Sequence, residues 1–196
     1  IVTSYFGPRR TYPRNYEESV DLFKKMFSYD SKVDAGIKHD TVIVNHLTAD
    51  ESVNNKVKKL LLDYDGAETK NGPVKIIHRP HENGEGIGFK SRQYAYDKYK
   101  DDYEFWFFAE DDYNFFYDFF YKKCVDVLKQ NKNTAFICTQ HNEVGFRKNH
   151  NDSDHCHGGM GCTHIKYLNK MVEFYGRLPY STMEDAGNEE RGGRAY

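Results

Sequence analysis

Three consecutive carboxylates, Glu110, Asp111 and Asp112, directly follow the apolar run Phe105–Ala109. Such a run predicts a strand that is buried on both faces. In an open α/β sheet, ligands bind at the carboxyl ends of the strands, so acids placed there can reach a ligand. Because adjacent acids repel one another, a divalent cation such as Mg²⁺ or Mn²⁺ would offset their charge. The triplet therefore predicts a metal site for a phosphate-bearing substrate, and its alternative is a solvated acidic cap on the next helix.

The second candidate site is a glycine-rich loop, residues 79–88, which precedes a predicted helix carrying Lys90 and Arg92 near its start. Glycines allow close backbone approach, and a helix N-terminus with basic side chains can hold a diphosphate. The loop lacks the Gly-x-x-x-x-Gly-Lys-Ser/Thr pattern, so it is not a Walker A loop. A flexible connection with a solvated basic face is the alternative. Arg9, Arg10 and Arg14 could likewise reach a phosphate or form a solvated basic loop.

A third group of possible ligands combines histidines and cysteines within fifteen residues. Its members are His150, His155, Cys156, His157, Cys162 and His164. Cysteine and histidine at this density could bind Zn²⁺, but their spacing matches no standard zinc module. We instead expect one histidine, His155 or His157, to orient an acceptor or a diphosphate, and a polar loop with solvated histidines is the remaining alternative.

The elements that must position these side chains alternate between apolar runs and helical patterns, which predicts an α/β fold with a mainly parallel sheet flanked by helices. A long polar segment, residues 140–162, interrupts this alternation. The expected strands are Ile1–Phe6, Asp40–Leu47, Val74–His78, Phe105–Ala109 and Thr134–Thr139. The expected helices are Tyr16–Tyr29, Glu51–Tyr64, Phe89–Tyr99, Asn114–Gln130 and Thr163–Tyr175.

Composition limits the class of protein. A chain of 196 residues is predicted to form one domain, and its 28 Lys and Arg against 30 Asp and Glu provide no global field for nucleic acid or a membrane surface. The four cysteines do not form a disulfide framework for a chain of this size, and Cys124 and Cys138 are expected in the core. With no signal peptide or membrane span in view, we expect a cytoplasmic protein or a domain trimmed from a longer one.

The order of these parts resembles the nucleotide-sugar-binding half of GT-A glycosyltransferases, especially the inverting family-2-like ones. A strand ending in Asn45-His46 is followed by Asn-Gly-x-Gly-x-Gly, by a helix with Arg92, and by an aromatic strand ending in Glu-Asp-Asp. The resemblance implies that Asp112 binds the metal bridging the donor diphosphate, with Glu110 or Asp111 near the ribose or sugar. It also implies that Thr3, Tyr5 and Asn45 surround the base, although the family often has an acid pair where this chain has Asn45-His46.

The resemblance continues downstream. Gly158-Gly159-Met160-Gly161, with His157 beside it, is similar to the family's acceptor-side glycine loop. Glu184-Asp185 is similar to the later acidic motif, in which the Asp serves as general base in inverting members. Thr182-x-x-Asp185 also has the pattern of a helix cap, which is the alternative. The donor-binding candidates then include Arg9, Lys90 and Arg92, and His155 joins Asp112 as a metal-ligand candidate.

The implied function is a metal-dependent glycosyltransferase that moves a sugar from a UDP- or GDP-linked donor to a carbohydrate acceptor hydroxyl, with inversion. Residues 1–112 would form the donor half and residues 113–196 the acceptor half. Its cofactor would be Mn²⁺ or Mg²⁺, and nucleic acid is not an expected partner. Two alternatives belong to other classes: a sugar-phosphate nucleotidyltransferase, and a non-catalytic domain that binds a nucleotide sugar or carbohydrate.

Overall fold

A six-stranded mixed sheet forms the centre of the computed structural model, which describes residues 1–7, 15–82, 87–113, 117–138, 141–142, 155–156 and 160–178. Its strands are β1 (Val2–Ser4), β2 (Thr41–His46), β3 (Val74–Arg79), β4 (Phe105–Glu110), β5 (Phe136–Cys138) and β8 (Gly161–His164). They are arranged in the order β3-β2-β1-β4-β8-β5. The first four strands are parallel, whereas β8 runs antiparallel to both of its neighbours. The expected single α/β domain with a mixed, mainly parallel sheet is confirmed.

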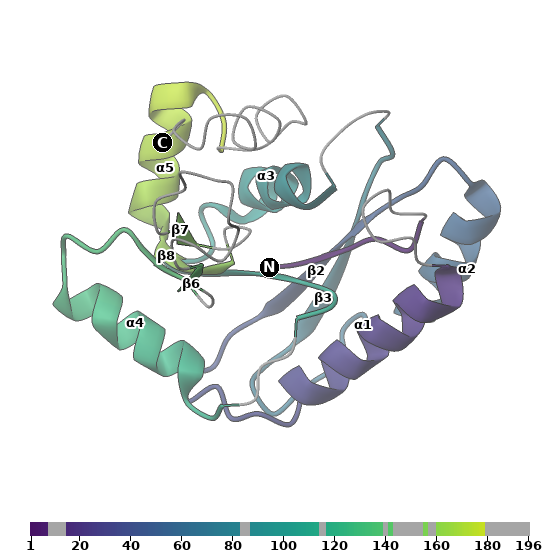
Figure 1. Cartoon of the computed structure of the whole chain (residues 1–196), viewed down its shortest axis with the longest axis horizontal. Coiled ribbons are helices and arrows are strands. Elements are labelled where there is room, and N and C mark those ends of the chain that lie inside the picture. The colour runs from purple at the N-terminus through teal and green to yellow at the C-terminus, as the bar shows by residue number, and fades with distance from the viewer. Residues whose placement is uncertain are drawn as a thin grey trace.

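Helices cover both faces of the sheet. Figure 1 shows α3 (Ile87–Tyr99) and α5 (Ile165–Tyr175) on one side, and α1 (Tyr16–Asp30) and α4 (Phe120–Gln130) on the other. The remaining helix, α2 (Glu51–Leu61), joins the α1 side, because Val57 and Leu61 belong to the same buried cluster as Phe23 of α1. A separate small pair, β6 (His141–Asn142) and β7 (His155–Cys156), is antiparallel.

Local sequence accounts for the starts of α1 and α2. Asn15 accepts a hydrogen bond from the backbone N–H of Glu18, whose carboxylate accepts one in return from the N–H of Asn15, so α1 begins with a capping box. At the start of α2, the side chain of Asp50 accepts hydrogen bonds from the backbone N–H groups of Ser52 and Val53.

Two helices begin later in the chain than the sequence pattern predicts. The helix expected from Asn114 begins at Phe120, because Phe119 adopts a left-handed conformation that a continuous helix does not allow. The helix expected from Thr163 begins at Ile165. Thr163 instead lies in β8, where its hydroxyl donates to the carbonyl of Ala135 at 2.6 Å. His164 is the actual cap, since its Nδ1 accepts from the backbone N–H of Lys166 at 3.0 Å.

The strand ahead of the acid triplet is only partly as expected. Trp106, Phe108 and Ala109 are buried, but Phe105 and Phe107 are half-buried. The two faces differ because Trp106 and Phe108 pack under α3 and α5, whereas Phe107 faces Phe120 and Tyr121 at the start of α4. None of the described helices is long and apolar enough to cross a membrane.

Candidate functional site

The carboxyl ends of β1–β4 bring polar side chains together on the face of the sheet that α3 covers. Side chains alternate between the two faces of a strand, and Val44, Ile77 and Phe108 mark the α3 face by packing in one cluster with Ala95 of α3. The next residue on this face of each strand is polar or ionisable: Thr3, His46, Arg79 and Glu110. Thr3 and Glu110 are register partners in adjacent strands, so this group spans neighbouring strands of the sheet.

Only one acid of the triplet belongs to this group. Glu110 is partly exposed, and its Oε1 lies 4.0 Å from the guanidinium Nη2 of Arg92. Asp111 points to the other face, is 2% exposed, and its Oδ2 accepts a hydrogen bond from the backbone N–H of Tyr5 at 2.9 Å. Asp112 lies half-buried just beyond the strand. Within the described ranges, no three His, Cys, Asp or Glu side chains converge on a point that could hold a metal by themselves.

The helix α3 supplies cations to the same edge, as the sequence predicts. Arg92 is buried, and its guanidinium carbon lies 5.0 Å from the ring centre of Phe89 and 5.4 Å from that of Phe108. Burial lowers the pKa of Arg92 to about 10, and the nearby Glu110 opposes that shift, so the guanidinium remains charged at neutral pH. A Cβ placed on Gly88, in the first turn of α3, would lie 3.4 Å from Glu110 Oε1, so the helix start directly adjoins the acid.

A second cluster of charge surrounds Glu82. Its Oε2 contacts the ammonium of Lys90 and lies 3.4 Å from Nη2 of Arg79, which is 2% exposed at the end of β3. The hydrogen bond from Lys90 and the charge of Arg79 lower the pKa of Glu82. One carboxylate therefore bridges two cations from different elements, which resembles the way that a phosphate would be held.

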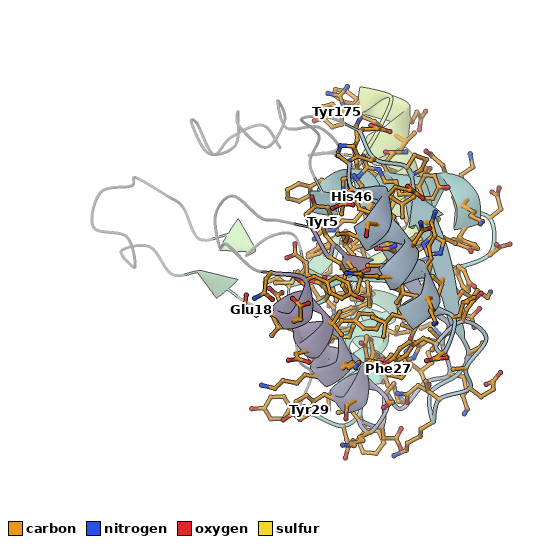
Figure 2. The ribbon with its side chains drawn as sticks, turned by 90° about the vertical axis from the view of Figure 1, so that its right-hand side faces the viewer. Tyr5, Glu18, Phe27, Tyr29, His46 and Tyr175 are labelled. Atoms are coloured by element: carbon orange, nitrogen blue, oxygen red, sulfur yellow. The ribbon has the colours of Figure 1, made fainter. Side chains whose placement is uncertain are left out.

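His46 is the most buried ionisable ring of this edge, at 2% exposure. Its centroid lies 5.4 Å from that of Tyr5 and 5.9 Å from that of His81, which is stacked on it, and Figure 2 shows Tyr5 and His46 side by side. Neither ring nitrogen has a hydrogen-bond partner among the described residues. Burial, together with the charges of Arg79 and His81, lowers the pKa of His46 to about 4, so the imidazole is neutral at pH 7.

Asn45, which the resemblance places beside the nucleotide base, is instead buried within the sheet. It is 1% exposed, and its Nδ2 pairs with Nδ1 of His78 on β3 at 3.1 Å. Thr3 is also buried, and its hydroxyl has no hydrogen-bond partner among the described residues. Five of the expected donor residues that the structure describes lie at the α3 face of the edge: Thr3, Tyr5, Lys90, Arg92 and Glu110. The side chains of Asn45 and Asp111 instead form hydrogen bonds that join parts of the sheet.

The other expected site residues lie outside the described part of the chain. They are Arg9, His157, Gly158, Gly159, Glu184 and Asp185, together with the side chain of His155. The side chains of two members of the histidine–cysteine group, Cys162 and His164, are described, and both have structural roles. Cys162 is buried in β8, where burial raises the pKa of its thiol to about 12, and His164 caps α5 while its Nε2 contacts Glu104 at 3.1 Å.

His46, Arg79 and Glu82 belong to the edge, but the sequence does not single them out individually as ligands, although Arg79 and Glu82 lie in the candidate loop 79–88. A signal for two of them is present. His46 follows Val42 and Val44 at the two-residue period of a strand, and Arg79 follows Lys75 and Ile77 in the same way. Because parallel strands end at the same edge, the last residue of each is expected to lie beside the other.

The described edge thus combines three cations, Arg79, Lys90 and Arg92, with the two carboxylates Glu82 and Glu110 at the start of a helix. Such an arrangement suits an anionic ligand with two phosphate groups, which basic side chains and helix N–H groups stabilise. The acids beside it could share a divalent cation with those phosphates. Comparisons of this chain with protein-family models, with curated proteins and with solved structures found no match.

Proposed function

We propose that the carboxyl edge of β1–β4 binds a nucleoside-diphosphate sugar together with Mn²⁺ or Mg²⁺, and that the protein is a glycosyltransferase of GT-A-like fold. One observation carries the proposal: the acids that end β4 adjoin the basic start of α3, with Glu110 Oε1 4.0 Å from Arg92. A diphosphate and its metal need these two kinds of group side by side. The mixed, mainly parallel sheet is consistent with this fold.

The residues of the edge divide into two roles under this proposal. Arg92 and Lys90 hold the diphosphate, and Arg79 adds a third cation from β3. Asp112 and Glu110 bind the metal. Mg²⁺ is usually held by one or two carboxylates plus substrate phosphates, so this role needs no group of three protein ligands. Asp111 has a different task, because its carboxylate already accepts the N–H of Tyr5.

The chemistry is charge stabilisation at the leaving group. When bound, a divalent cation held by Asp112 and Glu110 would supply positive charge beside the departing nucleoside diphosphate. The guanidinium of Arg92, buried near the rings of Phe89 and Phe108, is preorganised to stabilise the negative charge of this leaving group. On the acceptor side, a carboxylate takes the proton of the attacking hydroxyl. We assign that step to Asp185, assisted by Glu184, as the resemblance implies, and a single base there corresponds to inversion.

A thermal-shift panel tests donor binding most directly. UDP, GDP and their sugar conjugates are added with and without Mn²⁺, and we expect stabilisation that requires both components. Asp112→Asn should abolish the metal-dependent part. Asp63→Asn is the matched control, because Asp63 is exposed beyond the end of α2 and far from this edge in the fold. Equal stabilisation of the two variants would exclude Asp112 as a ligand.

Turnover is tested separately from binding. Each sugar nucleotide that stabilises the protein is incubated with a panel of saccharide acceptors, and release of the nucleoside diphosphate is measured. Release that Asp185→Asn removes, with donor binding unchanged, would support the transferase. Metal-dependent binding without release under any acceptor would favour a non-catalytic nucleotide-sugar domain instead. Release of pyrophosphate from a nucleoside triphosphate and a sugar phosphate would favour the nucleotidyltransferase.

A further inference from the structure

A cavity of about 580 Å³ opens at the amino ends of the parallel strands, on the edge opposite to the proposed donor site. It is lined by the beginnings of β1, β2 and β4 and by the connections that lead into them. Asp30, the last residue of α1, is one of the lining residues and follows Tyr29, which Figure 2 labels at the end of that helix. A volume of this size is typical of small-molecule sites.

The walls of the cavity are rich in aromatic rings. Its aromatic lining comprises Tyr103, Phe105, Trp106, Phe107 and Tyr121, with His39 beside them. The ring centroid of His39 lies 4.9 Å from that of Tyr121. Aromatic faces attract organic cations through their quadrupoles, and this attraction strengthens where water is excluded. The lining therefore suits a ligand that carries positive charge on an apolar body.

Asp30 provides a buried carboxylate for that charge. It is 7% exposed, and its Oδ1 accepts a hydrogen bond from the hydroxyl of Tyr121 at 3.1 Å. None of the described residues donates a hydrogen bond to its other oxygen, Oδ2. An ammonium placed in the cavity could donate to this oxygen, and such a charge-assisted hydrogen bond is stronger than one between neutral groups.

The charged groups around Asp30 do not neutralise it. Burial lowers the pKa of His39, so its imidazole is uncharged at pH 7. The ammonium of Lys38 donates outward to the carbonyl of Lys70. At the rim, Glu68 and Asp102 are exposed carboxylates, whereas Asp40 is already paired with Lys75 at 2.6 Å. Carboxyl groups therefore outnumber ammonium groups among the residues that line the cavity.

We propose that this cavity binds a small organic cation, a primary amine on an aromatic or branched apolar body, with the ammonium donating to Oδ2 of Asp30. The body packs among the aromatic walls, and the acidic rim attracts the cation from solution. The site is separate from the donor edge, because the two lie at opposite ends of the same parallel strands.

Trp106, the single tryptophan of the chain, lines the cavity and so reports on its occupant. The experiment titrates the full chain with phenethylamine, with neutral 2-phenylethanol and with anionic 3-phenylpropionate, following tryptophan fluorescence at pH 7. We expect saturable binding of the amine, tighter than either analogue by about tenfold or more, since a charge-assisted hydrogen bond and a cation–π contact act together.

Asp30→Asn should reduce the preference for the amine over the alcohol to nearly one. Asp21→Asn, on the exposed side of the same helix, is the matched control and should retain it. Equal affinity for amine and alcohol in the unaltered protein would overturn the proposal without any variant, as would a lack of saturation by the amine. A preference that survives in a folded Asp30→Asn protein would also overturn it.

Discussion

The carboxylate of Asp111 accepts a hydrogen bond from the backbone N–H of Tyr5, with Oδ2 and N 2.9 Å apart, and thereby ties the end of β4 to the end of β1. These two segments are 106 residues apart in sequence. The middle acid of the triplet is therefore a structural group with a fixed partner. The acids on either side of it, Glu110 and Asp112, are the ones whose positions suit a ligand.

This division of roles predicts different effects of alanine within the triplet. Asp111→Ala leaves the buried N–H of Tyr5 without its acceptor, and we expect the free energy of unfolding to fall by about 1–3 kcal/mol. Asp112→Ala, at a half-buried position, should cost less stability but remove metal-dependent nucleotide binding. Urea denaturation of both variants checks the first effect. Equal losses of stability would contradict the assignment.

We predict that nucleotide binding requires the planar guanidinium of Arg92 and not only its positive charge. The guanidinium carbon lies 5.0 Å from the ring centre of Phe89 and 5.4 Å from that of Phe108, and a lysine ammonium does not reproduce the planar fork of donors. Arg92→Lys should weaken metal-dependent binding of UDP or GDP by roughly tenfold or more through the lost hydrogen bonds. The reciprocal change Lys90→Arg, which keeps the charge, should retain binding. Calorimetric titration measures both, and wild-type affinity in Arg92→Lys would remove this residue from the site.

We predict that protonation of His46 makes the free energy of unfolding depend on pH. Its pKa is about 4 in the folded chain, against an ordinary value near 6.5 in the unfolded chain. Below pH 6.5 the unfolded state therefore binds a proton that the folded state resists, so stability falls as the pH decreases toward 4. Between pH 7 and 5 this contribution amounts to about 2 kcal/mol.

His46→Gln cannot take up that proton, so its free energy of unfolding should decrease less over the same interval. Urea denaturation at pH 7, 6 and 5 measures the difference between the two proteins. Above pH 7 both proteins should show the same pH dependence, which serves as the internal control. Parallel curves throughout the acid range would indicate that His46 titrates normally.

Gly161 is predicted to be essential for the antiparallel part of the sheet. It has a φ of +150°, and a Cβ there would lie 2.1 Å from the carbonyl oxygen of Ile137 in β5. Gly161→Ala should lower the free energy of unfolding by more than about 3 kcal/mol or prevent folding. Gly66, with a φ of +75° and open space around it, is the matched control, and its change to Ala should cost only about 1 kcal/mol. Thermal and urea unfolding compare the two.

The parallel part of the fold could be predicted from the sequence because each strand there is an apolar run between helical patterns. β8 could not. The segment Gly161–His164 has no apolar alternation of its own, and its conformation depends on pairing with β4 and β5. The later start of α4 depends on the backbone of Phe119, a residue type that rarely adopts a left-handed conformation.

The candidate site could likewise be predicted only in part, because the sequence does not show directly which way each side chain points. The acid triplet and the basic start of α3 could be assigned to one edge because parallel strands end together. Which acid faces α3 depends on the face of each side chain, and three adjacent acids carry no such signal. The neighbours do carry it: Glu110 shares a face with Phe108, and Asp111 shares one with Ala109. Asn45 differs for the same reason, because it lies on the strand face of Ile43 rather than on that of Val44.

The strand order also constrains how the chain can fold. β1 lies between β2 and β4, so one of its two edges stays open until residues 105–110 have been synthesised and have returned to it. Closing that distance before any contact forms is entropically costly, which slows folding of such sheets. A ribosome-bound or proteolytic fragment that ends before Phe105 would expose the edge of a buried strand. Such fragments should self-associate, which makes this interval of synthesis the one in which the chain most needs a chaperone.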